Sequence, residues 1–298
     1  MNTTPFPFHG LGIALVTPFH ADGSVDYDAL KHLVDYQICG GIDFLVVLGT
    51  TSEAPCLTVQ EKRDIRQCVV QQVAGRVPVV IGCGGNCTAE VVSEMRADNF
   101  EGMSGLLSVV PFYNKPNQEG LYQHFRAVAE AAPLPLLLYN VPSRTGANLA
   151  SETTLRLASD CPNIVGIKEA SGNMEQIQTI LNQRPQHFHV LSGDDSLTLD
   201  MMKMGAEGVI SVIGNALPRQ FRRMITLFEE GQQEEAQHIN QQLHDLYRLL
   251  FIDGNPAGIK ALLHLMGIAD NVLRLPLTPM HLNFIEKMQV QIRRMQLV

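Results

Sequence analysis

The sequence predicts an α/β fold, a (β/α)8 TIM barrel followed by a helical extension at its C-terminal end. Three observations support this prediction. Short uninterrupted apolar segments recur along the chain, segments with helical spacing of apolar residues lie between them, and only helical segments follow after about residue 225. Strands that are apolar at every position are typical of a parallel sheet covered by helices on both faces.

Eight segments have the composition of buried strands. They are Gly12–Thr17, Asp43–Gly49, Val77–Gly82, Gly105–Val110, Pro135–Val141, Asn163–Lys168, Phe188–Gly193 and Gly208–Val212. From the second segment onward their starts are roughly 20–35 residues apart, which is the length of one βα unit. Eight such units predict a closed barrel. A doubly wound open sheet is the alternative, which the lack of a G-x-G-x-x-G motif after the first segment disfavours.

Helical patterns link these segments. Residues Ala29–Ile38 have apolar spacings of three and four, and Gly40-Gly41 follows them as a helix end. Thr58 and Glu61 have the spacing of a capping box, in which each side chain binds the other residue's backbone N–H. The chain therefore predicts a helix after each of these strands.

The last part of the chain has helical patterns only. The expected helices are Phe221–Glu230, Glu234–Phe251, Pro256–Met266 and Thr278–Met295. The second of them has one apolar face, as a helix that packs against a core does. We therefore expect a barrel domain over residues 1–224 and a helical domain over residues 225–298.

Composition excludes several classes of function. The chain has 298 residues, 45% of them hydrophobic, and a net charge of −8, which argues against nucleic-acid binding. No apolar stretch approaches the roughly 20 residues of a membrane-spanning helix, and the N-terminal residues lack the features of a signal peptide. The cysteines form no C-x-x-C pair, and Cys83 and Cys87 have no histidine pair nearby. We expect reduced thiols, no metal site and a cytoplasmic location without membrane partners.

One lysine stands at the end of a predicted strand. Lys168 follows the uncharged run Asn163–Ile167. A lysine at the rim of an apolar core loses solvation, which lowers its pKa and makes the neutral, nucleophilic amine more available. Schiff-base chemistry on a carbonyl substrate requires such an amine. The structural alternative is a surface lysine just beyond a strand.

Further polar residues follow the other predicted strands. In a (β/α)8 barrel the active site lies at the C-terminal ends of the strands, so these residues are expected on one rim. They are Thr50, Thr51, Tyr113, Tyr139, Arg144, Asp194 and Asp195.

Each of these residues also has a structural interpretation. Thr50 and Thr51 either cap the next helix or bind a carboxylate at a helix N-terminus. Tyr139 is either a half-buried strand aromatic or a group that moves protons at the rim. Arg144 is either a solvated turn residue or a bidentate carboxylate ligand. For the two aspartates we favour a turn that caps the following helix.

Three motifs occur in order at the ends of these strands. They are Gly49-Thr50-Thr51-x-Glu53, Tyr139-Asn140-Val141-Pro142-x-Arg144-x-Gly146 and Gly166-Ile167-Lys168-Glu169. With them the chain resembles the dihydrodipicolinate synthase family, class I Schiff-base lyases and aldolases that act on pyruvate. The resemblance extends over essentially the whole chain, from Gly10 to Pro279.

The resemblance implies a reaction and a set of roles. The Lys168 amine would form an imine with pyruvate, and the derived enamine would attack L-aspartate 4-semialdehyde to give 4-hydroxy-tetrahydrodipicolinate, a step of diaminopimelate and lysine biosynthesis. The resemblance implies proton transfer by Tyr139 with Thr50 and Tyr113. It implies that the pyruvate carboxylate is held by Thr51 and by backbone groups of Gly193 and Ile210, and the semialdehyde carboxylate by Arg144. It implies no metal or organic cofactor, because the imine itself is the electron sink.

The resemblance also implies an assembly. In relatives the residue equivalent to Tyr113 reaches in from a neighbouring subunit. A tight homodimer, often within a homotetramer, is therefore expected.

Two alternative functions remain. N-acetylneuraminate lyase and the sugar-acid aldolases of this family keep the lysine and the tyrosine, but they usually carry serine at the position of Thr50 and lack an arginine at the position of Arg144. A barrel that binds a keto acid without catalysis is the second alternative, and the complete residue set disfavours it. Ser52 replaces a glycine of many members, which we expect to be tolerated if φ there is negative.

Some members of the family are inhibited by L-lysine at the tight-dimer interface. The positions that would contribute a site here include Asn86, Glu90, Lys62, Val59 and Phe112. The first two match the lysine-sensitive pattern, and the other three depart from it. Because Lys62 would place a cation beside a cationic effector, we expect weak or absent inhibition.

Overall fold

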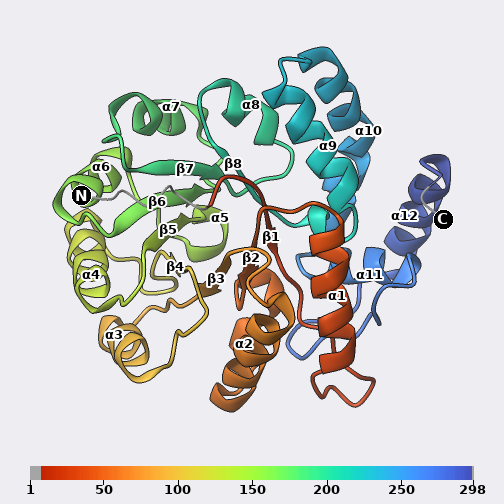
Figure 1. Ribbon diagram of the computed structural model, residues 1–298, viewed down its shortest axis with the longest axis horizontal. Coiled ribbons are helices and arrows are strands. Elements are labelled where there is room, and N and C mark those ends of the chain that lie inside the picture. The colour runs from red at the N-terminus through yellow and green to blue at the C-terminus, as the bar shows by residue number, and fades with distance from the viewer. Residues whose placement is uncertain (1–7, 297–298) are drawn as a thin grey trace. The chain divides into compact units, whose positions relative to one another are not determined.

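The computed structural model describes residues 8–296, in which eight parallel strands follow one another around a closed barrel (Figure 1). The strands are β1 (Gly10–Ala14), β2 (Phe44–Val47), β3 (Val79–Gly82), β4 (Gly105–Val109), β5 (Leu136–Asn140), β6 (Ile164–Glu169), β7 (His189–Ser192) and β8 (Gly208–Ser211). Almost every strand residue is buried, as their uninterrupted apolar composition requires. The predicted (β/α)8 barrel is confirmed, and the open sheet is excluded.

Several strand ends differ from the prediction. β1 is Gly10–Ala14, whereas residues 12–17 were expected. The backbone beyond it is held by a side chain, since Val16 N–H donates to Asn215 Oδ1 at 3.1 Å. β2 ends at Val47 because Leu48 adopts the left-handed region at φ 59°. β6 continues to Glu169, which places Lys168 within the strand.

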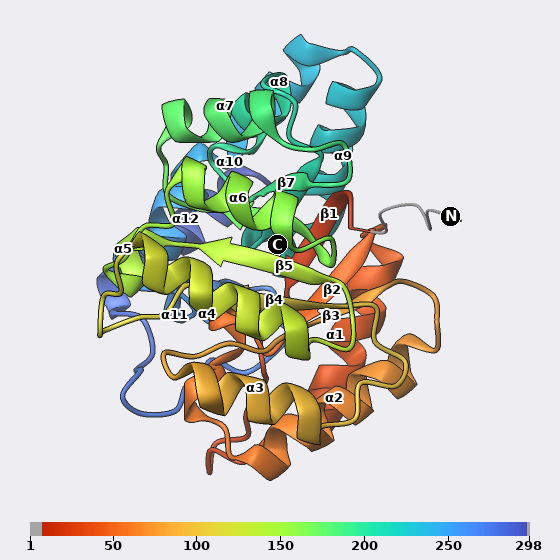
Figure 2. The ribbon, with the colours of Figure 1, turned by 90° about the vertical axis from the view of Figure 1, so that its left-hand side faces the viewer.

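The chain forms two compact units, of which the first comprises residues 8–10 and Pro78–Ile210. Its helices are α3 (Thr88–Ala97), α4 (Gln118–Ala131), α5 (Pro142–Thr145), α6 (Ser151–Asp160), α7 (Met174–Gln183) and α8 (Thr198–Lys203). Figure 1 shows α3, α4, α6 and α7 outside the strands, and Figure 2 shows α4, β5 and α6 alongside one another. Asn117 and Asn173 cap α4 and α7 by accepting backbone N–H groups.

The second unit comprises residues 11–77 and 211–296. It begins with α1 (Tyr27–Cys39), the one-turn helices η1 (Thr50–Ser52) and η2 (Ala54–Cys56), and α2 (Val59–Val73). The expected capping box starts α2, because Thr58 Oγ1 accepts from Glu61 N–H and Glu61 Oε2 accepts from Thr58 N–H. Thr58 is therefore the cap of this helix, and the capping interpretation of Thr50 and Thr51 is wrong.

The helical end of the chain also belongs to the second unit. After the one-turn helix η3 (Ile213–Asn215) come α9 (Pro218–Glu229), α10 (Gln233–Ile252), α11 (Ala257–Leu265) and α12 (Leu282–Arg294). The last helix was expected from Thr278, but it begins after His281, whose N–H donates to Asp253 Oδ2. Residue 224 lies inside α9, and the division into residues 1–224 and 225–298 stays a prediction.

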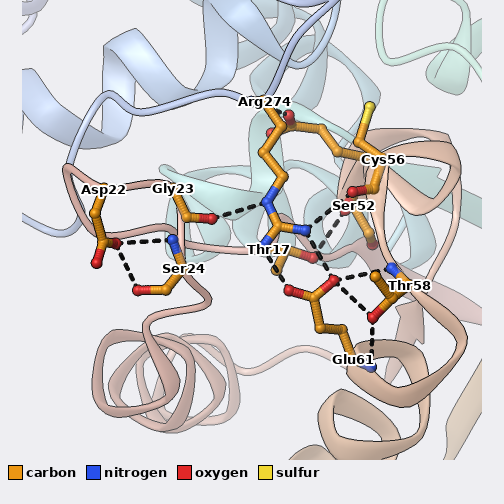
Figure 3. Close-up of polar contacts among 10 residues, drawn as sticks. Thr17, Asp22, Gly23, Ser24, Ser52, Cys56, Thr58, Glu61 and Arg274 are labelled. Carbon is orange, nitrogen blue, oxygen red and sulfur yellow. Dashed lines mark hydrogen bonds and ion pairs between the residues drawn. The ribbon is translucent and has the colours of Figure 1, made fainter.

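Buried and half-buried charged residues connect the C-terminal segment to the turn that follows β2 and to α2. The Arg274 guanidinium donates to the Gly23 and Cys56 carbonyls and to Glu61 (Figure 3). Its backbone N–H donates to Glu53 Oε2 at 3.0 Å. Lys260 is ion-paired with Glu53 at 2.5 Å. Hydrogen bonds from Arg274 hold the pKa of Glu61 at about 2, so this pair stays charged at neutral pH.

Candidate active site

Lys168 and Tyr139 lie together in the first unit. They are register partners on the neighbouring strands β6 and β5. Both side chains are buried, and Lys168 Nζ lies 4.4 Å from the centroid of the Tyr139 ring. The surface interpretation of Lys168 is therefore wrong, since only 5% of the residue is exposed. Removal of the amine from water favours its neutral form.

The charge of Lys168 is set by its surroundings. Burial lowers the pKa of Lys168 to about 8, the Asp195 carboxylate opposes this shift, and the Arg144 guanidinium adds to it. At pH 7 roughly a tenth of the amine is therefore neutral, far more than for a lysine with an ordinary pKa. Schiff-base formation needs this neutral, nucleophilic form.

The two aspartates after β7 differ in role. Asp194 Oδ1 accepts from the N–H and the hydroxyl of Ser196, as expected of a turn that leads into a helix. Asp195 is buried, and its charge acts on Lys168. The purely structural interpretation is thus incomplete for Asp195.

Arg144 lies on a rigid turn. Helix α5 is one turn long, and Gly146 ends it at φ +72°, a backbone conformation that side chains disfavour. The Thr145 hydroxyl holds the same turn by donating to the Val141 and Ala147 carbonyls. The Arg144 side chain is exposed, so it can bind a ligand without first breaking a contact in the protein interior.

Tyr113 points into solvent. Its side chain is 87% exposed, and its backbone is left-handed at φ +74°, which is uncommon for a bulky residue. The backbone is held there, since Tyr113 N–H donates to the Thr145 carbonyl and Asn114 Nδ2 donates to the Asn86 carbonyl. Strained backbone of this kind is often found at functional sites.

Gly193 gives space to the lysine. A Cβ at this position would lie 3.1 Å from Lys168 Cε and 2.6 Å from Ala170 Cβ. Its N–H already donates to the Glu169 carbonyl at 2.8 Å. Ile210 is buried in β8.

Thr50 and Thr51 belong to the second unit. They form η1 between two residues in the left-handed region, Leu48 and Glu53. Thr51 is buried, and its Oγ1 accepts a hydrogen bond from Asn255 Nδ2 at 3.0 Å. A hydroxyl that accepts from an amide is left to donate its own proton elsewhere, as a carboxylate ligand would require.

Ser52 fits the same turn. Its φ is not among the positive ones, and its hydroxyl donates to the Leu15 carbonyl at 2.5 Å. The Thr17 hydroxyl in turn donates to the Ser52 carbonyl at 2.8 Å. The expectation that serine is tolerated at this position therefore agrees with the backbone found there.

The effector positions are spread over both units. Asn86 belongs to the first, where its Nδ2 donates to the Phe112 carbonyl at 3.1 Å. Glu90 is exposed in the first turn of α3. Lys62 belongs to the second unit, in the first turn of α2. Whether these residues form an effector site stays a prediction.

The structure also bears on metal and membrane interactions. Among residues 8–296, no three His, Cys, Asp or Glu side chains are grouped so that they could hold a metal ion. None of the helices in the described part of the chain combines the length and the hydropathy needed to span a bilayer.

Comparison with known proteins identifies the family. The family described as the dihydrodipicolinate synthetase family matches residues 7–295. The chain belongs to this family. The 4-hydroxy-tetrahydrodipicolinate synthase of Parabacteroides distasonis, a relative, is 53% identical over 288 residues, which cover 97% of each chain.

Solved structures of the family have the same fold. The dihydrodipicolinate synthase from Aquifex aeolicus is similar with a TM-score of 0.94 and 42% identity, over 97% of this chain and 99% of that one. The enzyme from Cyanidioschyzon merolae with lysine bound is similar with a TM-score of 0.94 and 40% identity, over 98% and 99% of the two chains. The resemblance inferred from the three motifs is confirmed.

Three further polar residues had been given no role at the site, although two of them stand in the quoted motifs. Asn255 precedes α11 in the helical end of the chain, 204 positions from Thr51. Asn140 and Glu169 directly follow Tyr139 and Lys168, and both are fully buried. Because side chains alternate along a strand, Asn140 and Glu169 lie on the opposite face of the sheet from Tyr139 and Lys168. This alternation could have been inferred from the sequence.

Proposed function

We propose that this chain is a 4-hydroxy-tetrahydrodipicolinate synthase that condenses pyruvate with L-aspartate 4-semialdehyde through a Schiff base at Lys168. The observation that carries the proposal is the buried amine with a pKa of about 8 beside Tyr139, in a chain that belongs to this family. The relative from Parabacteroides distasonis, which is named for this activity, supports the choice of reaction.

The proposed reaction starts on pyruvate. The neutral amine of Lys168 attacks the keto carbon, and loss of water gives a protonated imine. Loss of a proton from the pyruvate methyl group then gives an enamine, with the imine nitrogen as the electron sink. Tyr139 is the proposed proton carrier for these steps, and the closeness of its ring, whose centroid is 4.4 Å from the Lys168 amine, supports this role.

The second substrate completes the reaction. The enamine carbon attacks the aldehyde carbon of the semialdehyde and forms the new carbon–carbon bond. The amino group of the semialdehyde then attacks the imine carbon, which closes the ring and releases Lys168. Arg144 is the proposed ligand of the semialdehyde carboxylate, because a guanidinium can bind both carboxylate oxygens.

Further residues complete the proposal. Thr51 would donate to the pyruvate carboxylate, which the hydrogen bond from Asn255 supports. Thr50 and Tyr113 would pass protons to and from Tyr139. The exposed, strained Tyr113 supports a second copy of this chain as partner, since its side chain extends outward. We therefore propose a homodimer, or a homotetramer made of two such dimers.

The location and the absent partners are part of the proposal. The free thiols of Cys39, Cys56, Cys68, Cys87 and Cys161 support a reducing compartment such as the cytoplasm. The net charge of −8 supports the absence of nucleic-acid partners.

The test is pyruvate consumption with two competing aldehydes. We expect fast consumption with L-aspartate 4-semialdehyde and none above background with N-acetylmannosamine. Consumption with the sugar alone would instead establish N-acetylneuraminate lyase or a related aldolase. No consumption with either aldehyde would favour a barrel that binds a keto acid without catalysis.

The pH dependence of imine formation is expected to follow Lys168. Because only the neutral amine reacts, the rate of pyruvate trapping should rise through about pH 8 and level off above it. Asp195→Asn removes a charge that raises this pKa, so the plateau should begin at lower pH. Arg144→Gln removes a charge that lowers it, so the plateau should begin at higher pH. Shifts in the same direction for both variants would contradict this account.

Inhibition by L-lysine is expected to be weak or absent. The enzyme from Cyanidioschyzon merolae was solved with lysine bound. This chain carries Lys62 and Val59 at two of the positions where the family resemblance places an effector site. We expect no inhibition at about 1 mM L-lysine, near neutral pH, in initial-rate assays. Lys62→His should increase sensitivity, and Lys31→His, on the exposed surface of α1, is the matched control. A sub-millimolar inhibition constant for the unaltered protein would refute the expectation.

A further inference from the structure

A second pair of polar residues stands directly behind Tyr139 and Lys168. Asn140 and Glu169 are the next register partners on β5 and β6. Because side chains alternate along a strand, this pair occupies the opposite face of the sheet from the lysine and the tyrosine. Neither residue has any exposed surface. The reaction proposed above makes no direct use of either.

Glu169 accepts hydrogen bonds from three different residues. Its carboxylate receives Asn140 Nδ2 at 3.1 and 3.3 Å, Ser171 N–H at 2.7 Å and Gln176 Nε2 at 3.2 Å. These partners present N–H groups, which suits a carboxylate because it can only accept when ionised. Burial raises the pKa of Glu169, and these hydrogen bonds oppose the shift. Glu169 is thus an ionisable group in the protein interior, where burial of a charged carboxylate costs free energy.

The hydrogen bonds extend from Glu169 to the segment that carries Arg144. Asn140 Nδ2 also donates to Asn148 Oδ1 at 2.9 Å, and Asn140 Oδ1 accepts from Leu149 N–H at 3.0 Å. Asn148 Nδ2 donates to Gln176 Oε1 at 2.8 Å. The cluster therefore joins the ends of β5 and β6, the chain just after the Arg144 turn, and the first turn of α7.

We propose that Asn140 and Glu169 are positioning residues that hold Tyr139 and the Arg144 turn in place relative to Lys168. The inference rests on the proposed function, in which these three residues act on the substrates. Asn140 and Glu169 follow Tyr139 and Lys168 directly in their strands. A hydrogen bond that fixes Asn140 against Glu169 therefore also fixes the register of Tyr139 against Lys168. Precision of this kind matters, since a displacement of about 1 Å at a catalytic group can cost ~10²-fold in rate.

The main test reverses the polarity of one contact. Glu169→Gln keeps the shape of the side chain but places an NH₂ group against the donors Asn140 Nδ2 and Gln176 Nε2. We expect kcat to fall ~10²-fold, with a much smaller change in KM for pyruvate. Borohydride trapping of pyruvate should slow in parallel. The double variant E169Q/N140D exchanges donor and acceptor, because the amide introduced on β6 can then donate to the carboxylate introduced on β5. It should recover at least about tenfold in kcat relative to E169Q.

The matched control is Glu207→Gln. Glu207 is also a hydrogen-bonded carboxylate of the first unit, bound by Arg184, His189 and the Val190 N–H, but it directly precedes β8. E207Q should retain the kcat of the unaltered protein. A kcat for E169Q that matches that of E207Q, or no recovery in the double variant, would overturn the inference.

A milder variant tests the same cluster if E169Q does not fold. Asn148 is exposed, and Asn148→Ala removes its side-chain hydrogen bonds to Asn140 and Gln176, which weakens the link to the Arg144 segment without leaving a buried polar group unpaired. It should raise KM for the semialdehyde more than KM for pyruvate, and equal effects on both would count against the inference. Failure of the proposed function would differ from all of these results, because the unaltered protein would then form no pyruvate adduct at Lys168.

Discussion

Treatment with pyruvate and borohydride is expected to add one reduced pyruvate adduct per chain, at Lys168. The reason is the neutral fraction of an amine whose pKa burial lowers to about 8. Borohydride reduces the imine to a stable secondary amine, so intact-protein mass spectrometry detects the addition and peptide mapping locates it. Lys168→Ala should abolish the adduct and reduce kcat by ~10⁴-fold or more, because no covalent intermediate can form.

Lys260 provides an internal control for this experiment. Its pKa is also lowered to about 8, and only 1% of the residue is exposed. Its amine is nevertheless occupied, since it is paired with Glu53 at 2.5 Å and donates to the Val272 carbonyl at 2.8 Å. We expect no adduct there. An adduct that persists in the Lys168→Ala variant, or one mapped to Lys260, would defeat the proposed mechanism.

Arg144→Ala is expected to impair the second half of the reaction far more than the first. Loss of a bidentate, charge-assisted contact of about 1.5–3 kcal/mol should raise KM for L-aspartate 4-semialdehyde by ~10–10²-fold. Pyruvate trapping should stay within a few-fold of that of the unaltered protein when it is measured above pH 8, where the higher pKa expected for Lys168 matters less. Steady-state kinetics with each substrate varied in turn, together with the trapping rate, separate these effects.

Two further variants make the Arg144 test specific. Arg144→Lys keeps the charge but loses the planar fork, so its KM for the semialdehyde should lie between those of the unaltered protein and Arg144→Ala. Arg156→Ala removes another exposed arginine of the same unit, paired with Glu119 on the outer helices, and should change neither substrate's kinetics. If Arg144→Ala lowered imine formation and semialdehyde turnover equally, the residue would be structural.

Local patterns were sufficient to predict much of the architecture. Apolar segments such as Leu136–Asn140 are recognisable because a strand buried on both faces needs an apolar side chain at nearly every position. The capping box of Thr58 and Glu61 is a contact between residues three positions apart, so it can be read directly. The start of α12 was missed because it depends on Asp253, which is far away in the sequence.

The sequence by itself determined the barrel, its order of elements and the family, because periodicity, caps and motifs are local properties of the chain. It also indicated Lys168, as an amine at the end of an apolar strand. Only the tertiary structure decided how that amine is tuned, since burial and the charges of Asp195 and Arg144 act through space. The same holds for the hydrogen bond from Asn255 to Thr51 and for the cluster around Glu169, whose partners come from separate elements of the fold. Such contacts depend on distances that folding creates, and no spacing along the chain encodes them.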